Sequence, residues 1–368
     1  MEKQLTVRQC CIIVFVLIIA NKLMMLPSII SFNSANDAWL TFLLSFVLDF
    51  VIALGIIGII THSKQTIVEF LKKKLGRIVT SVILAAISFI FILKIVDIMF
   101  ETYTMFNEYI YVDFSSVLFF AVILLVIVYF GTRELRSLGR TVEILFTTIC
   151  GALILSFFIS VGSADFTNIF PILQTGISRI AQNSFIHIFW YCDSFILLFF
   201  VGNVKKEKHI TKKFILSYLA TILTVIVFVL IFTMAFANTA SMHRTCILDI
   251  GENIPRLLTE GRFNWIIYFI FPIAPIFAIA VYSYFTVNCI SFQIEKFVVR
   301  KKLIACILTI ANVFGTLFTF KGLWNNFYAF TSSVMPYICT VVQIIFPIIL
   351  IVAYFLSARK KGGKVWKK

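Results

Sequence analysis

Residues 10–30 read CCIIVFVLIIANKLMMLPSII, an apolar stretch that carries Asn21 and Lys22 near its middle and Pro27 shortly afterwards. About 20 helical residues cross the hydrocarbon core of a bilayer, so the stretch is long enough to span a membrane. A charge at that depth costs on the order of 2.5–3.5 kcal/mol and usually faces a bundle interior or water. The stretch therefore predicts a membrane helix interrupted near its middle, where freed backbone groups could hold a polar ligand. In the alternative interpretation, Lys22 forms a structural ion pair and Pro27 simply ends the helix.

Further apolar stretches of similar length follow, separated by short polar loops. Hydrophobic residues make up 61% of the 368 residues, and the mean hydropathy is +1.01, whereas soluble domains are about 45–50% apolar. Helices are expected because every backbone polar group must be satisfied within the lipid. The sequence thus predicts an all-α integral membrane protein with ten transmembrane helices. The expected spans are 10–30, 38–61, 78–98, 115–131, 142–162, 183–203, 214–238, 264–291, 303–320 and 334–357.

The 32 Lys and Arg residues fall mostly on the two ends of the chain and on alternate loops. The basic loops are residues 64–77, 133–140, 205–213 and 296–302. By the positive-inside rule, this pattern places both termini in the cytoplasm and requires an even number of spans. The net charge of +15 is therefore a topology signal and a contact for anionic lipid headgroups. A nucleic-acid partner is not expected.

The chain has no P-loop, no GxSxG motif and no soluble segment long enough for a catalytic domain. Its eight cysteines and four histidines show no metal-ligand spacing. We therefore expect no enzyme activity, no catalytic residue, no cofactor and no metal.

Polar residues retained inside the spans are the candidates for binding, because burying them in lipid is costly. Asp193 is the leading candidate, in the polar run Trp190-Tyr191-Cys192-Asp193-Ser194 of the sixth span. The alternative role for Asp193 is a structural partner of Lys22. The eighth span is expected to kink at Pro272 and Pro275 and to line a pathway. The predicted ligand-binding residues are Asn21, Lys22, Tyr191, Asp193, Ser194, Tyr282 and Asn288.

Three more charged residues in the spans suggest ion pairs or gates. Lys94 and Asp97 lie three residues apart on one helical face, so a local pair is expected. Asp49 in the second span could be the counter-ion of Lys22. The long outer loop, residues 239–263, could form either a short interfacial helix or a packed loop.

Ten spans divide into five and five, with a polar break in the first helix of each half. This is the layout of inverted-repeat transporters of the LeuT-like type, which bind ligands near the membrane midplane. We expect one domain over residues 1–368, with a first repeat at about 10–162, a second at about 183–357 and a basic tail at 358–368.

Several short motifs, taken in order, resemble those of a known family. The chain resembles the endospore germination permeases, the GerAB-like B subunits of spore germinant receptors in the amino acid-polyamine-organocation superfamily. The similarity covers nearly the whole length. In place of the family's glycine-containing break in the first span, this chain has Ala20-Asn21-Lys22, and Asp193 stands where relatives carry a glutamate. The motifs are Gln4-Leu5-Thr6, Leu26-Pro27-Ser28, Asn36-Asp37-Ala38-Trp39-Leu40, Thr66-Ile67-Val68-Glu69-Phe70, Gly131-Thr132-Arg133-Glu134, Gly139-Arg140-Thr141-Val142-Glu143-Ile144 and the segment 165–173.

The resemblance implies a germinant-sensing subunit in the spore inner membrane that works with a membrane A subunit and a lipoprotein C subunit. It implies that a small germinant, such as an amino acid, binds in the midplane pocket. Lys22 would then suit a ligand carboxylate, and Asp193 would suit an amine. The alternative is a proton-coupled permease for amino acids or cationic substrates in the cell membrane, and a scaffold subunit with a vestigial pocket is a third possibility.

Overall fold

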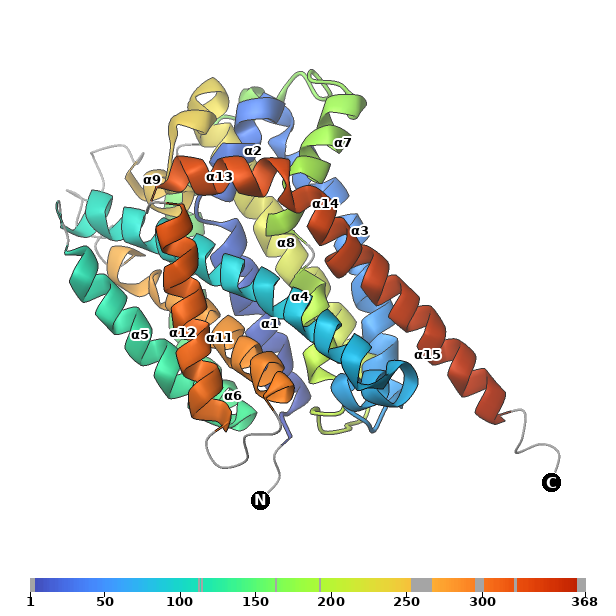
Figure 1. The fold of residues 1–368 in the computed structure, drawn as a ribbon. Coiled ribbons are helices and arrows are strands. Elements are labelled where there is room, and N and C mark those ends of the chain that lie inside the picture. The colour runs from blue at the N-terminus through green and yellow to red at the C-terminus, as the bar shows by residue number, and fades with distance from the viewer. Residues whose placement is uncertain are drawn as a thin grey trace.

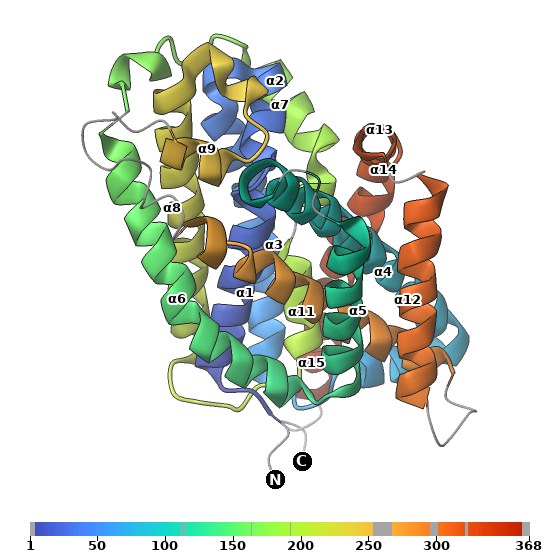
Figure 2. The same cartoon turned by 90° about the vertical axis from the view of Figure 1, so that its left-hand side faces the viewer.

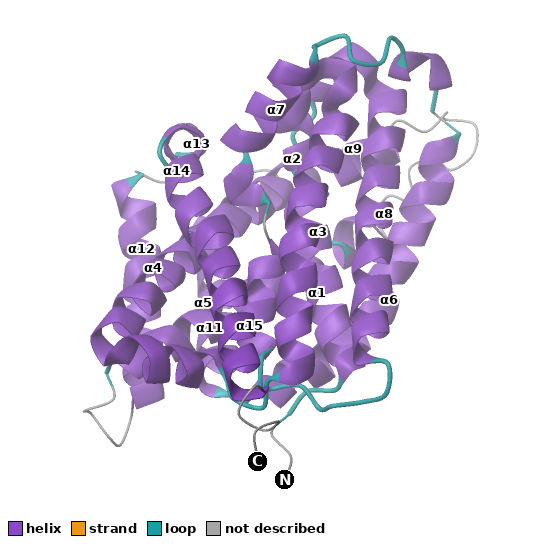
Figure 3. Ribbon diagram, turned by 90° about the vertical axis from the view of Figure 1, so that its right-hand side faces the viewer, coloured by secondary structure: helices purple, strands orange, loops and turns teal. Residues whose placement is uncertain are grey.

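The computed structural model describes residues 4–111, 113, 115–162, 164–191, 193–252, 267–294, 301–320 and 323–362. Helices make up nearly all of this part of the chain, and Figure 3 shows them running between two layers of short loops. The β-type contact described is an isolated bridge between Leu5 and Val204. The outer loop beyond Glu252 and the basic loop at 296–300 lie outside the described residues. The predicted all-α fold is confirmed.

The first span is interrupted where the sequence predicted. Helix α1 (Val7–Lys22) ends at Lys22, and α2 (Leu26–Ser34) begins four residues later. A capping box starts α1, because Thr6 accepts from the backbone of Gln9 and the Gln9 side chain accepts from the backbone of Thr6. Pro27 stands in the first turn of α2, where its missing N–H has no intrahelical partner to lose.

Each other expected span coincides with a helix or with an interrupted helix. The remaining elements of the first half are η1 (Ala35–Asp37), α3 (Ala38–His62), α4 (Ile67–Met105), η2 (Phe106–Ile110), α5 (Ser116–Thr132) and α6 (Leu135–Val161). Those of the second half are η3 (Phe166–Ile169), α7 (Ile177–Ile186), η4 (Ile188–Trp190), η5 (Asp193–Phe200), α8 (Ile210–Phe236), η6 (Ala237–Met242), α9 (Cys246–Glu252), α11 (Ile273–Gln293), α12 (Lys301–Thr319), α13 (Trp324–Ser333), α14 (Met335–Cys339), η7 (Thr340–Ile345) and α15 (Phe346–Gly362).

The length and apolarity of each helix indicate whether it can span a membrane. Among the described residues, seven helical segments are long and apolar enough to cross a membrane. The pair Ile177–Ile186 and Ile188–Phe200, bent by 61°, would make eight. Helices α1 and α5 have 16 and 17 residues and are shorter than each of these seven segments. A multi-pass membrane protein is therefore established, while the count of ten stays a prediction.

Helices α1 and α11 lie at the centre of the bundle. Helix α1 packs against α6, α8, α11 and η5, and α11 packs against α4, α5 and α12 (Figures 1 and 2). Large apolar side chains face outward on the surrounding helices. Ile78, Phe158 and Phe318 are 81%, 79% and 86% exposed, which suits contact with lipid.

Described residues of the basic loops gather at one end of the bundle. Lys206 Nζ donates to the Thr61 carbonyl at 2.9 Å, and Lys302 Nζ donates to the Arg133 carbonyl at 3.3 Å. The first residues of α1 and the last of α15 lie at this same end (Figure 3). We call it the terminal end, and the opposite end the α9 end. The cytoplasmic location of the terminal end stays a prediction.

Candidate functional site

Two lysines and one aspartate meet in the interior, where both interrupted spans break. Lys22 Nζ lies 2.7 Å from Asp193 Oδ2, and Lys94 Nζ lies 2.8 Å from Asp193 Oδ1. The three residues are 1%, 5% and 5% exposed. Lys22 is the last residue of α1, Lys94 lies within α4, and Asp193 begins η5. One carboxylate thus bridges two ammonium groups, and this triad carries a formal charge of +1.

Neutral polar groups complete the surroundings of the triad. Trp190 is the last residue before the break that precedes η5, and its carbonyl accepts a hydrogen bond from Lys22 Nζ. Asn21 Nδ2 donates to the Tyr282 hydroxyl at 2.8 Å and to Asp193 Oδ1 at 3.3 Å. The Tyr282 hydroxyl donates to Asp193 Oδ1 at 3.3 Å. Both carboxylate oxygens of Asp193 therefore have partners, as a buried ion pair requires. We call Asn21, Lys22, Lys94, Asp193 and Tyr282 the charged cluster.

Two other predicted ligand residues lie beside this cluster. The ring of Tyr191 lies under the Lys22 ammonium, with Nζ 4.9 Å from the ring centroid. A cation over an aromatic face is attracted by the ring quadrupole. Ser194 directs both its N–H and its hydroxyl to Asp49 Oδ1. Side-chain contacts thus join five of the seven predicted ligand residues, namely Asn21, Lys22, Tyr191, Asp193 and Tyr282. Ser194, the sixth, follows Asp193 directly in the chain.

The ion pairs expected for Asp49 and Asp97 are not found among the described residues. Asp49 accepts from Ser194 and from the Tyr218 hydroxyl, and it forms no ion pair with Lys22 among the described residues. Lys94 reaches across to Asp193 in η5 instead of along α4 to Asp97. The reason is the position of Asp193, which lies between both ammonium groups and can neutralise them at short distance. Helical spacing alone cannot show such a partner from another element.

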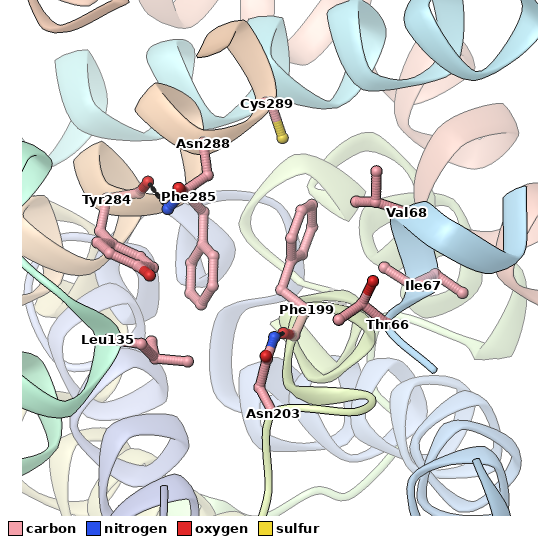
Figure 4. Close-up of a pocket in the computed structure, with 10 residues that line it drawn as sticks. All are labelled: Thr66, Ile67, Val68, Leu135, Phe199, Asn203, Tyr284, Phe285, Asn288 and Cys289. Carbon is pink, nitrogen blue, oxygen red and sulfur yellow. Dashed lines mark hydrogen bonds between the residues drawn. The ribbon is translucent and has the colours of Figure 1, made fainter. Parts of the chain in front are cut away.

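Asn288 does not join the cluster. It lies nearer the terminal end and lines a separate pocket of about 260 Å³. Its amide donates to the Tyr284 carbonyl of its own helix at 2.8 Å. Figure 4 shows this pocket between α11, the start of α4 and the segment after η5. The lining residues are Thr66, Ile67, Val68, Leu135, Phe199, Asn203, Tyr284, Phe285, Asn288 and Cys289.

An aromatic layer separates this pocket from the charged cluster. The ring centroids of Phe91 and Phe199 are 5.5 Å apart, and those of Phe199 and Phe285 are 5.0 Å apart. Phe91 also contacts Tyr282 of the cluster, with 5.5 Å between centroids. The cavity at the cluster itself measures about 10 Å³, roughly the space of one water molecule. In this conformation the cluster is therefore closed and holds no ligand-sized space.

The α9 end is closed by direct contacts with the first interrupted span and with η2. The Cys246 N–H at the start of α9 donates to the Met24 carbonyl at 3.0 Å, inside the break between α1 and α2. Arg244 pairs with Glu108 at 3.4 Å. Within the described part of the outer loop, Cys246–Glu252 form a short helix, α9. The remainder of that loop, residues 253–263, lies outside the described residues.

Sequence reasoning missed three buried polar residues near the cluster. Glu101 is 1% exposed and follows Asp97 by four residues on α4, so helical spacing could have identified it. Gln343 is 1% exposed and lines the small cavity at the cluster. It stands out as a polar residue within an apolar span. Tyr218 gave no comparable signal, because only the packing of α8 on α3 brings it to Asp49.

Comparison with known proteins adds family and fold. Residues 4–321 match the spore permease family, described as "Spore germination protein". A search of proteins with curated descriptions found no match. Among solved structures, the chain is similar to the crystal structure of MhsT in complex with L-phenylalanine, with a TM-score of 0.55 and 14% identity. That similarity covers 94% of this chain and 98% of the MhsT chain, and it supports the LeuT-like fold alone. The matched residues make this chain a member of the spore germination protein family, a permease-type, multi-pass membrane protein with a LeuT-like fold.

Proposed function

We propose that this protein is the germinant-sensing subunit of a spore germination receptor and that it binds a small zwitterion, such as an amino acid, at the charged cluster. One observation carries the proposal: Lys22 and Asp193, a fully buried ion pair, lie where both interrupted spans break. An amino acid carries the same two charged groups. Its carboxylate can replace Asp193 as the partner of Lys22, and its ammonium can replace Lys22 as the partner of Asp193.

The closed cluster supports sensing by a change of conformation. A cavity of about 10 Å³ cannot hold an amino acid, so binding requires the helices around the breaks to move apart. A ligand that stabilises the rearranged state shifts the equilibrium by its difference in affinity for the two states, which is sufficient for signalling. Transport is not required. The A and C subunits of the receptor and the spore inner membrane are part of this proposal through the family.

A germination assay on spores that lack the gene tests the proposal. The spores are complemented with the parent gene or with Lys22→Met, and exposed to amino acids, sugars and nucleosides. Lys22→Met is the informative variant because Lys94 still neutralises Asp193. We expect at least a tenfold loss of sensitivity to the germinants that the parent gene restores. Lys64→Met, a change at an exposed loop residue, is the matched control and should respond like the parent.

Protein abundance in the spore membrane is measured for each variant. A normal response from Lys22→Met at normal abundance contradicts the proposed ligand site. A parent gene that restores no response to any compound contradicts the sensor function. Uptake of labelled amino acids into proteoliposomes, driven by a proton gradient, would then favour the permease alternative, which the buried charges also support.

A further inference from the structure

Two buried carboxyl groups next to the charged cluster have oxygens without hydrogen-bond partners. Asp97 and Glu101 are 4% and 1% exposed, and Asp97 Oδ1 and Glu101 Oε1 lack partners among the described residues. Four residues apart on α4, they lie on the same helical face. The buried indole N–H of Trp190 lies next to Asp97. Burying an ionised carboxylate in this way is costly unless something compensates its charge.

The other charged groups in the centre of the bundle already have partners. Both ammonium groups, Lys22 and Lys94, contact Asp193. Asp49 accepts hydrogen bonds from the N–H and hydroxyl of Ser194 and from Tyr218, so these neutral donors, and not the two lysines, stabilise its charge. The triad of two lysines and Asp193 leaves a charge of +1, which can offset one further negative charge nearby. Asp97 and Glu101 would together supply two.

We propose that Asp97 and Glu101 form a proton-binding site that holds one proton between its two carboxyl groups while the α9 end is closed. With one carboxyl neutral, the remaining carboxylate balances the +1 of the triad. With both ionised, two like charges would lie one helical turn apart, which strongly disfavours the doubly charged state. A proton needs no cavity.

The charged and titratable groups that face the pair come from several elements. They are Lys22 of α1, Lys94 of α4 itself, Asp193 of η5 and the thiol of Cys246 in α9. Glu101 also lies beside the backbone of Met25, in the break between α1 and α2. The neighbouring Met24 carbonyl accepts the Cys246 N–H that joins α9 to the break. Loss of the proton would place a new negative charge at this junction, and we infer that it favours opening of the α9 end.

Infrared spectroscopy of the full-length protein in lipid nanodiscs tests the site without any ligand. The probe is the carbonyl-stretch band of a protonated carboxyl group, which shifts on transfer to D₂O. We expect this band at neutral pH in the parent, and its loss or a clear shift in both Asp97→Asn and Glu101→Gln. These amides keep the shape of the carboxyl groups. Glu108→Gln, a change nearer the end of the same helical span, is the matched control and should leave the band unchanged.

A second variant tests the charge balance. Lys22→Met removes one positive charge, so the pair should retain a second proton and the band should grow to about twice its area. Absence of the band from the parent, or its persistence unchanged in both amide variants, would overturn the proposal. An unchanged band in Lys22→Met would overturn the charge balance that underlies it. The coupling to signalling rests on the proposed function, but these measurements use no germinant, so failure of the proton site and failure of the sensor function are distinguishable.

Discussion

The two ends of the bundle differ in how they close the path to the charged cluster. At the α9 end, closure depends on polar contacts between elements, such as Cys246 N–H to the Met24 carbonyl and the Arg244–Glu108 ion pair. At the terminal end, a pocket of about 260 Å³ lies below a layer of Phe91, Phe199 and Phe285. Polar contacts can be exchanged for water or ligand, whereas packed rings block passage by volume. The comparison indicates that the contacts closing the α9 end can be exchanged for water or a ligand. The packed rings at the terminal end form a steric barrier.

The first test of this comparison determines which end of the bundle faces the outside of the cell. Met242→Cys at the α9 end and Lys208→Cys at the terminal end are each exposed positions. In intact cells, a membrane-impermeant maleimide should label Met242→Cys and leave Lys208→Cys at the level of the parent. The positive-inside rule is the physical reason. The reverse pattern would show that the α9 end faces the cytoplasm.

The largest expected effect on stability comes from the charged cluster between the two ends. Asp193→Asn leaves two buried ammonium groups without a carboxylate, and breaking a buried ion pair in this way costs about 3–5 kcal/mol. Lys22→Met should cost less, because Lys94 remains paired with Asp193. Thermal unfolding in nanodiscs measures the order of the two variants. Equal melting temperatures would mean that Asp193 does not neutralise both lysines.

A glycine next to the terminal pocket offers a test of packing at that end. Gly202 has a φ of +77°, and an added Cβ would lie 2.7 Å from the backbone N of Thr66, which lines the pocket. Gly202→Ala therefore combines backbone strain of about 1–3 kcal/mol with an overpacking cost of about 1–3 kcal/mol. Gly76→Ala has the same kind of strain at φ +80° but no atom within 4 Å. Melting temperatures should fall further for Gly202→Ala, and an equal fall would show that the contact relaxes freely.

The smallest expected effect on stability comes from a change at the surface of the α9 end. The Arg244 side chain is 74% exposed, and its ion pair with Glu108 is open to solvent. Arg244→Gln should therefore change the free energy of unfolding by less than about 1 kcal/mol. If this contact helps to hold the α9 end closed, hydrogen exchange at Cys246–Glu252 should nevertheless increase. Unchanged hydrogen exchange would mean that the backbone contact of Cys246, and not the Arg244–Glu108 ion pair, holds the α9 end closed.

Sequence patterns predicted the membrane fold, the position of the first break and most of the cluster residues. The break at Lys22 could be predicted because a lysine and an asparagine within an apolar run, followed by Pro27, act locally on one helix. Residues near the middle of different spans lie at similar depths in the membrane. That is why Lys22, Lys94 and Asp193 could each be recognised as intramembrane charges before any contact between them was known.

The tertiary structure alone decided which of these charges are paired. Asp193 serves both lysines, Asp49 contacts Tyr218, and Asn288 faces a different pocket. These outcomes depend on the rotation and depth of one helix relative to another, which hydropathy does not encode. The unpartnered oxygens of Asp97 and Glu101 have the same origin. Composition and spacing determined that this protein keeps charges inside the membrane, and the packing of interrupted helices decided which of them keep an oxygen without a partner among the described residues.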